Sequence, residues 1–270
     1  MGRPPDRQGA DLVLLDGARA RPAGGVELVV ALIVVTLFTA LHAASARDFA
    51  AATANALTVQ AVERPLHLDV ERATNAWLAG HAVLAQAAVD VYRSHYLVVV
   101  GVLAWTYVRH PEVYLQVRRT LVAMFALVLP VYWAFPLSPP RFALAGVVDI
   151  VAARSPIGSH ATGPGEEGQS YTAMPSMHVG LSLWCAWAVW TALRGAHPRL
   201  ALLAWLFPLT MTAVVLTTGN HYVLDVVGSV VLLVASVSAA TLWAHHVGRR
   251  GVSPAGAPSP ARPPAQLRRP

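Results

Sequence analysis

The chain contains no lysine, one cysteine and few charged residues of either sign. All 20 basic residues are arginines, so a cationic contact must come from Arg or from a protonated His. The lone Cys185 excludes an internal disulfide. Charged residues make up 13% of the 270, against roughly 25% in a typical soluble domain. So few polar side chains cannot cover a soluble surface, and the composition favours a membrane protein.

The net charge of +6 does not indicate a nucleic-acid partner. The arginines lie beside apolar runs, where membrane orientation places them, and 55% of the residues are hydrophobic. We therefore expect a multi-pass protein of the cell membrane that binds no nucleic acid.

Six apolar runs are long enough, or nearly long enough, to cross a bilayer, which takes about 20 residues and about 17 at the least. They predict an all-α fold, a polytopic six-transmembrane-helix bundle. The runs are 26–46, 93–108, 120–136, 178–193, 200–218 and 222–245.

The distribution of arginine predicts the orientation of this bundle, because arginine-rich loops stay in the cytoplasm. With the N-terminus inside, 14 arginines fall on inner segments and six on outer segments. Both termini are therefore expected in the cytoplasm. The outer six are Arg47, Arg64, Arg72, Arg93, Arg141 and Arg154.

The ends of the chain differ in composition from its apolar middle. Residues 1–25 are expected to form a disordered cytoplasmic N-terminus, and residues 247–270, rich in Pro and Arg, a disordered tail. The six-span membrane catalytic domain is expected over 26–246, with its core at 90–245. Residues 48–91 have mixed polarity and predict one or two amphipathic helices on the outer surface, an extracytoplasmic segment.

Three polar motifs interrupt the apolar pattern, and the predicted topology places all three on the outer face. The first, at 135–141, reads Phe-Pro-Leu-Ser-Pro-Pro-Arg. The second, at 174–180, reads Met-Pro-Ser-Met-His-Val-Gly, and the third, at 217–225, reads Thr-Thr-Gly-Asn-His-Tyr-Val-Leu-Asp. Their common face predicts one shared site.

The third motif holds the strongest candidate for a catalytic pair. His221 and Asp225 are four residues apart, so on a helix they share one face. The carboxylate can accept the imidazole N–H and leave the other ring nitrogen free as a base or nucleophile. Asp225 also stands in an apolar run, where an ionisable residue needs a partner or a function. A structural pair that satisfies only itself is the alternative.

The other two motifs supply groups suited to a phosphate. Ser176 is placed to cap the helix of the fourth run, since Pro175 stops that helix from starting earlier, and a helix start with His178 in it suits an anion. Arg141 follows three prolines that stiffen its turn, and its planar fork matches phosphate oxygens. The alternatives are an interfacial histidine and an ordinary loop arginine.

Together the motifs resemble the type-2 phosphatidic acid phosphatase superfamily, whose pattern is K-x6-R-P, P-S-G-H and S-R-x5-H-x3-D. Residues 175–178 match the second motif, and His221 with Asp225 matches the end of the third. The chain looks most like the branch that includes the inositol phosphorylceramide synthases (aureobasidin-resistance type), which has a Pro-Pro-Arg turn, P-S-x-H-x-G and H-Y-x-x-D. The resemblance covers about residues 90–245. It departs from the family pattern at Ala134 and Val215, where the family has Lys and Arg.

The resemblance implies a mechanism without a cofactor or a metal. His221 would attack phosphorus and form a phosphohistidine, oriented by Asp225, while His178 would protonate the leaving oxygen and then activate the acceptor. Arg141, with Ser176 and Asn220, would bind the phosphate oxygens. The partner is then a phospholipid or lipid-phosphate substrate.

Several alternatives stay open at the level of sequence. An alcohol acceptor such as inositol makes the protein a phosphotransferase, and water makes it a phosphatase acting on phosphatidate or polyprenyl phosphates. Two histidines and a carboxylate could also form a metal site, although Arg141 would repel the cation. An inactive lipid carrier or scaffold is the alternative of another class. The oligomeric state is not predicted. The loop residues considered for the acceptor site are Glu166, Glu167, Gln169 and Tyr171.

Overall fold

A computed structural model describes residues 22–45, 48–154 and 171–251. Within these ranges the fold is helical, and the only strand-like pairing is an isolated bridge between Leu137 and Thr172. Most of the two predicted disordered ends, and Glu166, Glu167 and Gln169, lie outside the described residues.

Each of the six apolar runs coincides with helix. Five helical stretches are long and apolar enough to cross a membrane, and the fourth run forms a helix of 17 residues, just below that length. The protein is therefore a multi-pass helical membrane protein. We propose that the shorter fourth helix crosses the membrane as well, which would give six crossings. The helices are α2 (Gly24–Ala43), α5 (Ala82–Arg109), α6 (Pro111–Ala134), α9 (Met177–Leu193), α10 (Pro198–Leu203), α11 (Leu206–Thr217) and α12 (Val223–Gly251).

The second, third and fifth predicted runs differ from the helices that form there, for local reasons. α5 begins 11 residues before its apolar run, because Gln86 donates to Asp90 one turn on (3.0 Å) and keeps the polar stretch helical. α6 begins at Pro111, whose ring favours the first position of a helix. The fifth run is broken between α10 and α11 because Pro208 cannot donate to the carbonyl of Ala204.

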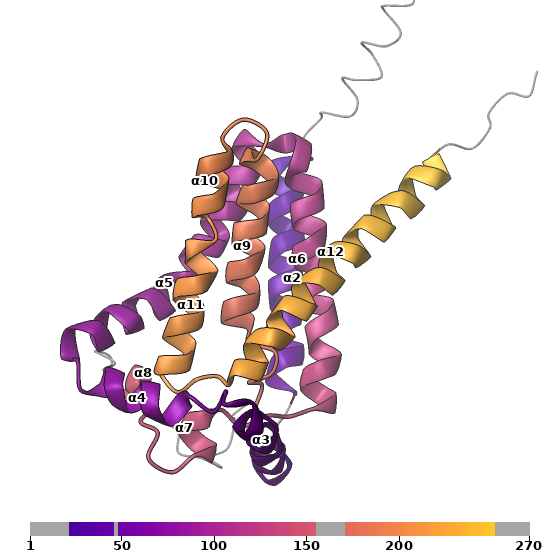
Figure 1. Cartoon of the computed structure of the whole chain (residues 1–270). Coiled ribbons are helices and arrows are strands. Elements are labelled where there is room, and N and C mark those ends of the chain that lie inside the picture. Colours follow the sequence, from indigo (N-terminus) through magenta and orange to yellow (C-terminus); the bar gives the residue numbers. More distant parts are fainter. Residues whose placement is uncertain (1–21, 46–47, 155–170, 252–270) are drawn as a thin grey trace, which may run out of the picture.

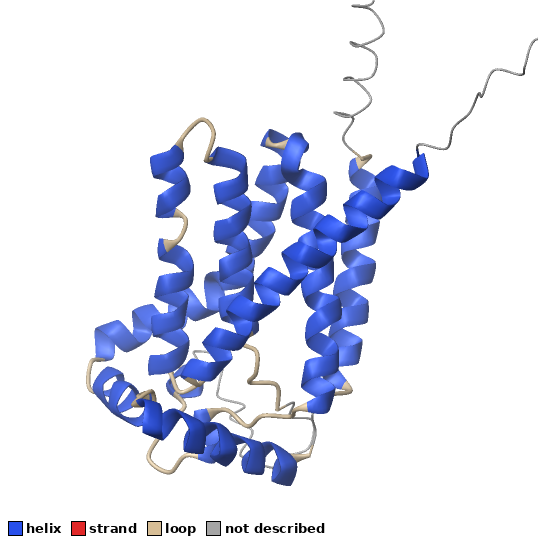
Figure 2. Ribbon diagram, turned by 45° about the vertical axis from the view of Figure 1, so that its right-hand side comes forward, coloured by secondary structure: helices blue, strands red, loops and turns tan. Residues whose placement is uncertain are grey.

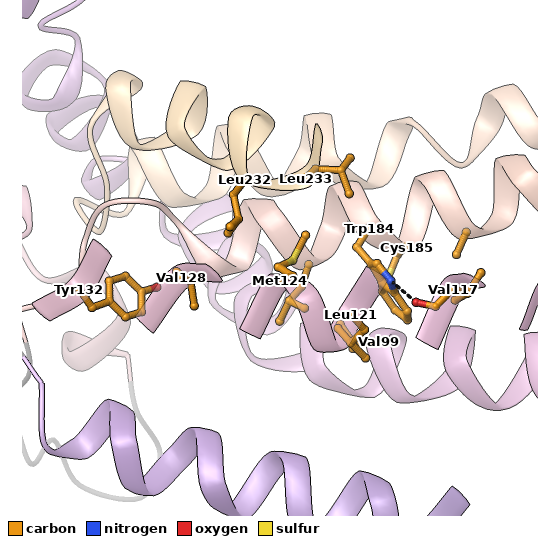
Figure 3. Close-up of a cluster of buried hydrophobic side chains, with 12 residues drawn as sticks. Val99, Val117, Leu121, Met124, Val128, Tyr132, Trp184, Cys185, Leu232 and Leu233 are labelled. Atoms are coloured by element: carbon orange, nitrogen blue, oxygen red, sulfur yellow. Dashed lines mark hydrogen bonds between the residues drawn. The ribbon is translucent and has the colours of Figure 1, made fainter. Parts of the chain in front are cut away.

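α9 is the central helix of the bundle and packs against α5, α6, α10, α11 and α12. Its Trp184 is fully buried, and the indole N–H donates to the carbonyl of Val117 in α6 at 3.1 Å (Figure 3). Met124 and Leu232 complete this part of the core from α6 and α12. The fully packed surroundings of α9 hold its first turn, which carries His178, in one place.

The described parts of the two chain ends lie at the same end of the bundle, while the short helices gather at the other (Figures 1 and 2). An even number of crossings would bring both ends to one side, and we propose from the arginine count that this side is the cytoplasm. The segment predicted as one or two surface helices forms two, and its last part, from residue 82, is the start of α5. The short helices are α3 (Phe49–Glu63), α4 (Glu71–Ala79), α7 (Pro140–Ala143), α8 (Ile150–Ala153) and the 3₁₀ turn η1 (Arg64–Leu66).

Candidate active site

A cavity of about 320 Å³ lies among α7, the start of α9 and the loop before α12. All three polar motifs contribute to its wall, through Arg141, His178, Asn220 and His221. Four of the six predicted site residues thus surround one space, whereas Ser176 and Asp225 do not line it. The remaining wall residues are Phe38, Thr39, His42, Tyr92, Tyr96, Tyr132, Pro139, Thr172, Ala173 and Met177.

The His221 ring is held in one tautomer. Its Nδ1 lies 3.1 Å from Oδ2 of Asp225 and 2.9 Å from the backbone carbonyl of Ala173. A carbonyl oxygen can only accept, so Nδ1 must carry the hydrogen. In the neutral ring Nε2 is then unprotonated, with its lone pair available as a nucleophile or base.

Asp225 lies in the first turn of α12 and is fully buried. Besides the imidazole, its Oδ2 accepts the backbone N–H of Tyr222 at 2.9 Å, as the third helical residue does in a capping box. Helix geometry therefore explains both the spacing of His221 from Asp225 and the carboxylate that orients the ring.

The turn between α11 and α12 requires a glycine. Gly219 has a φ of +76°, and a Cβ there would lie 2.6 Å from Cγ1 of Val147. The backbone N–H groups of Asn220 and His221 then both donate to the carbonyl of Val215, at 3.1 and 3.3 Å. This tight turn brings Asn220 and His221 to the cavity wall.

His178 faces His221 from the first turn of α9. The predicted cap of this helix is confirmed, since Oγ of Ser176 accepts the N–H of Val179 at 3.4 Å. The His178 ring stacks on Tyr92 at 4.1 Å, between centroids, and lies 4.8 Å from His95. Ser176 itself is fully buried and does not line the cavity, so its phosphate contact stays a prediction.

The two imidazoles line the same cavity, with their ring centroids 6.3 Å apart. Both rings are therefore placed to contact a group bound in this cavity.

Arg141 is oriented by neighbours on both sides. Its Nη1 donates to Oδ1 of Asn220, and its Nε lies 3.2 Å from Oδ2 of Asp149, an ion-pair distance without hydrogen-bond alignment. Its backbone N–H donates to the carbonyl of Gly219 at 3.0 Å, which ties the first motif to the third. Within the described residues Nη2 forms no hydrogen bond and is left for an anion. Asn220, predicted to bind phosphate, holds the guanidinium here.

Replacing Arg141 with lysine should lower kcat/KM by about 10²–10³-fold, the usual cost of one lost charge-stabilising donor. Lysine keeps the positive charge but cannot contact Asn220, Asp149 and a phosphate with one planar group. Steady-state kinetics on the purified variant measure the effect. Arg199→Lys, at an exposed position of α10, is the matched control and should keep the wild-type rate. A wild-type rate in Arg141→Lys would show that the guanidinium is not needed for the reaction.

A backbone bridge fixes the carbonyl that holds His221. The Leu137 N–H donates to the carbonyl of Tyr171 at 2.8 Å, and the Ala173 N–H donates to the carbonyl of Leu137 at 3.1 Å. The segment just before Arg141 thus positions the segment just before His178. Tyr171, considered for the acceptor site, is buried beside this bridge and does not line the cavity.

Some residues of the site escaped the sequence analysis. Tyr92 and Tyr96 line the cavity from α5, and His95 between them packs against His178 with both ring nitrogens buried and without a partner in the described structure. Polar residues spaced three or four apart inside an apolar helix were the available signal. Asp149, which pairs with Arg141, has no such pattern around it.

A comparison with family models matches residues 57–239 to the PAP2 superfamily, about two thirds of the chain. The chain belongs to the PAP2 superfamily. Membership in this family of type-2 phosphatidic acid phosphatases indicates a membrane enzyme, a lipid phosphatase or phosphotransferase. The PAP2 match begins within α3, so α4, the end of α3 and most of the cavity wall belong to the family region, whereas Phe38, Thr39 and His42 of the wall precede it. Neither the search of curated proteins nor that of solved structures gives a match.

Proposed function

We propose that this PAP2 protein is a lipid phosphotransferase that moves a phospho-alcohol headgroup, such as inositol phosphate, to or from a lipid through a phosphohistidine on His221. The observation that carries the proposal is the fixed tautomer of His221. Its Nδ1–H is held by Asp225 and by the Ala173 carbonyl, which leaves Nε2 as the one nitrogen that can attack.

The reaction has two steps. In the first, Nε2 of His221 forms a bond to phosphorus, the bond to the leaving oxygen breaks, and protonated His178 gives its proton to that oxygen. In the second, the acceptor hydroxyl gives its proton to His178, its oxygen bonds to phosphorus, and the nitrogen–phosphorus bond breaks. Asp225 stabilises the positive charge on the His221 ring in between. Arg141 and the start of α9 stabilise the phosphoryl oxygens.

The charge of the cavity supports a phosphodiester as the substrate. Arg141 is the sole arginine among the described residues that line the cavity, and the positions of the two further family cations hold Ala134 and Val215. A phosphodiester carries a single negative charge, whereas a phosphomonoester carries about −1.5 to −2 at pH 7. One guanidinium and one helix start balance the smaller charge.

The apolar part of the cavity supports a lipid substrate. Phe38 from α2, Tyr96 from α5 and Tyr132 from α6 form its wall on the side of the membrane helices. α2 is largely exposed along its apolar length and would face lipid tails. A lipid substrate can place its phosphate at His221 and its tails along these helices. It therefore matches both the polar and the apolar part of the cavity. We also propose that this end of the bundle faces the outside, as the arginine count predicts.

Labelled phosphatidylinositol and phosphatidate, each supplied with and without ceramide or inositol, test this proposal on the purified protein. Headgroup transfer predicts a new labelled lipid or exchange of labelled inositol, with no dependence on added metal and no loss with chelator. Release of inorganic phosphate from phosphatidate alone would favour the hydrolase alternative. Absence of any product, with His221→Asn identical to the wild type, would favour the carrier or scaffold.

A further inference from the structure

Two buried glutamates lie beneath the site, outside the three motifs. Glu63 ends α3 and Glu71 begins α4, and their exposed fractions are 0% and 1%. Their carboxyl groups are within hydrogen-bonding reach of each other. One oxygen of each, Oε2 of Glu63 and Oε1 of Glu71, has no other partner within the described residues. We call Glu63 and Glu71 the acid pair.

The acid pair holds the start of α12. Oε1 of Glu63 accepts the backbone N–H of Leu224 at 2.7 Å, and the carboxyl of Glu71 accepts that of Val223. The backbone N–H groups on either side already have acceptors. That of Tyr222 donates to Oδ2 of Asp225, and that of Asp225 donates to the carbonyl of Tyr222. The first free N–H groups of the catalytic helix are thus satisfied by a segment about 160 residues earlier in the chain.

Two carboxyl groups in contact away from water cannot both be ionised, so the acid pair retains one proton. The titratable groups that act on it are acidic or neutral, namely Asp69, Tyr222 and Asp225. Arg64 donates to Gln60 instead (2.9 Å), and no Arg or His of the described residues forms an ion pair with either glutamate. Among the described residues, no ion-pair partner is therefore in place to balance a second negative charge.

We propose that Glu63 and Glu71 are positioning residues, which hold the first turn of α12, and with it His221 and Asp225, only while they share a single proton. This inference rests on the proposed function of His221. Loss of the proton places two negative charges side by side, next to Asp225, and pushes α3 and α4 away from the helix start. The reacting nitrogen then moves relative to His178.

The pH dependence of this device follows from its burial. Burial above all, together with Glu71 and the charge of Asp225, raises the pKa of Glu63 to about 8, against the opposing hydrogen bond from the backbone N–H of Leu224. Burial likewise raises the pKa of Glu71. A carboxyl with a raised pKa in the folded state contributes most to stability below its unfolded pKa, near 4.5. This contribution is lost progressively from there until the pH has risen through about 8.

The test is the pH profile of phosphatidate or phosphatidylinositol turnover, together with thermal unfolding at each pH. In the wild type, kcat should fall as the pH passes about 8, and the midpoint of unfolding should fall progressively as the pH rises from about 4.5 to about 8. Glu63→Gln mimics the protonated form, since its amide accepts from Leu224 and donates to Glu71. It should keep the rate at neutral pH and flatten both of these pH-dependent falls. Glu63→Ala should lower kcat about 10–100-fold at every pH, as a displacement of about 1 Å does, with a much smaller change in KM.

Glu112→Gln is the matched control, because Glu112 is 57% exposed and lies at the far end of the bundle. Its profiles should follow those of the wild type. Superimposable pH profiles of Glu63→Gln and the wild type would overturn the positioning role even if Glu63→Ala does not fold. If His221→Asn is inactive in the same assay, the proposed function of His221 is still supported even though the positioning role is not. If His221→Asn is active, both the proposed function and the positioning role are contradicted.

Discussion

Replacement of His221 with asparagine should abolish turnover, with a loss of about 10⁴-fold or more, because no other group can take the place of a nucleophile. Asparagine is chosen because its amide N–H can replace Nδ1–H. It can keep the contacts with Asp225 and the Ala173 carbonyl, so the turn should stay folded. The variant lacks an atom at the position of Nε2 and cannot bond to phosphorus.

Two measurements separate this result from a folding defect. Brief incubation with substrate labelled at phosphorus should leave an acid-labile, base-stable label on the wild-type protein and none on His221→Asn. The unfolding temperature of the variant should stay close to that of the wild type. His197→Asn, at an exposed position between α9 and α10, should retain full turnover. Normal labelling of His221→Asn would assign the covalent step to another residue.

Replacement of His178 with glutamine should lower kcat by about 10²–10⁴-fold for a lipid alcohol leaving group, the usual contribution of a positioned acid. Stacking on Tyr92 and the contact with His95 are worth about 0.5–1.5 kcal/mol each, too little for their loss to unfold the bundle. The defect should therefore lie in proton transfer.

The leaving group distinguishes this role from simple positioning. A nitrophenyl ester releases an oxygen that needs no proton, so His178→Gln should be far less impaired with it than with the lipid ester. His81→Gln, an exposed histidine before α5, should behave as the wild type with both substrates. An equal loss on the two substrates would contradict the role of His178 as an acid.

The fold could be predicted from sequence where the signal lies within a single helix. Apolar runs located the five helical stretches long enough to cross a membrane and the shorter α9, and Ser176 marked the start of α9, because both signals are local. The start of α5 was wrong because the polar residues before 93 were taken as a break, although Gln86 and Asp90 join across a helix turn. The break at 204–205 depends on Pro208, whose effect was not considered.

The site could be predicted only as far as local spacing reaches. The pairing of His221 with Asp225 follows from a separation of four residues. The Ala173 carbonyl and Glu63 depend on packing between segments 48 and 161 positions apart, and no local pattern marks them. The composition showed that lysine is missing, but only the folded chain shows that Asn220 and Asp149 flank the one arginine in the cavity wall.

The carbonyl of Ala173 also constrains the regiochemistry of any adduct. A carboxylate can take up a proton and stop accepting from the ring, but an amide oxygen keeps its acceptor character at every pH at which the protein folds. The imidazole therefore cannot exchange the roles of its two nitrogens while the backbone stays in place. On the proposed mechanism a single positional isomer should form, with the substituent on the ring nitrogen remote from the main chain. Two-dimensional nuclear magnetic resonance of the trapped peptide would distinguish it from the other isomer.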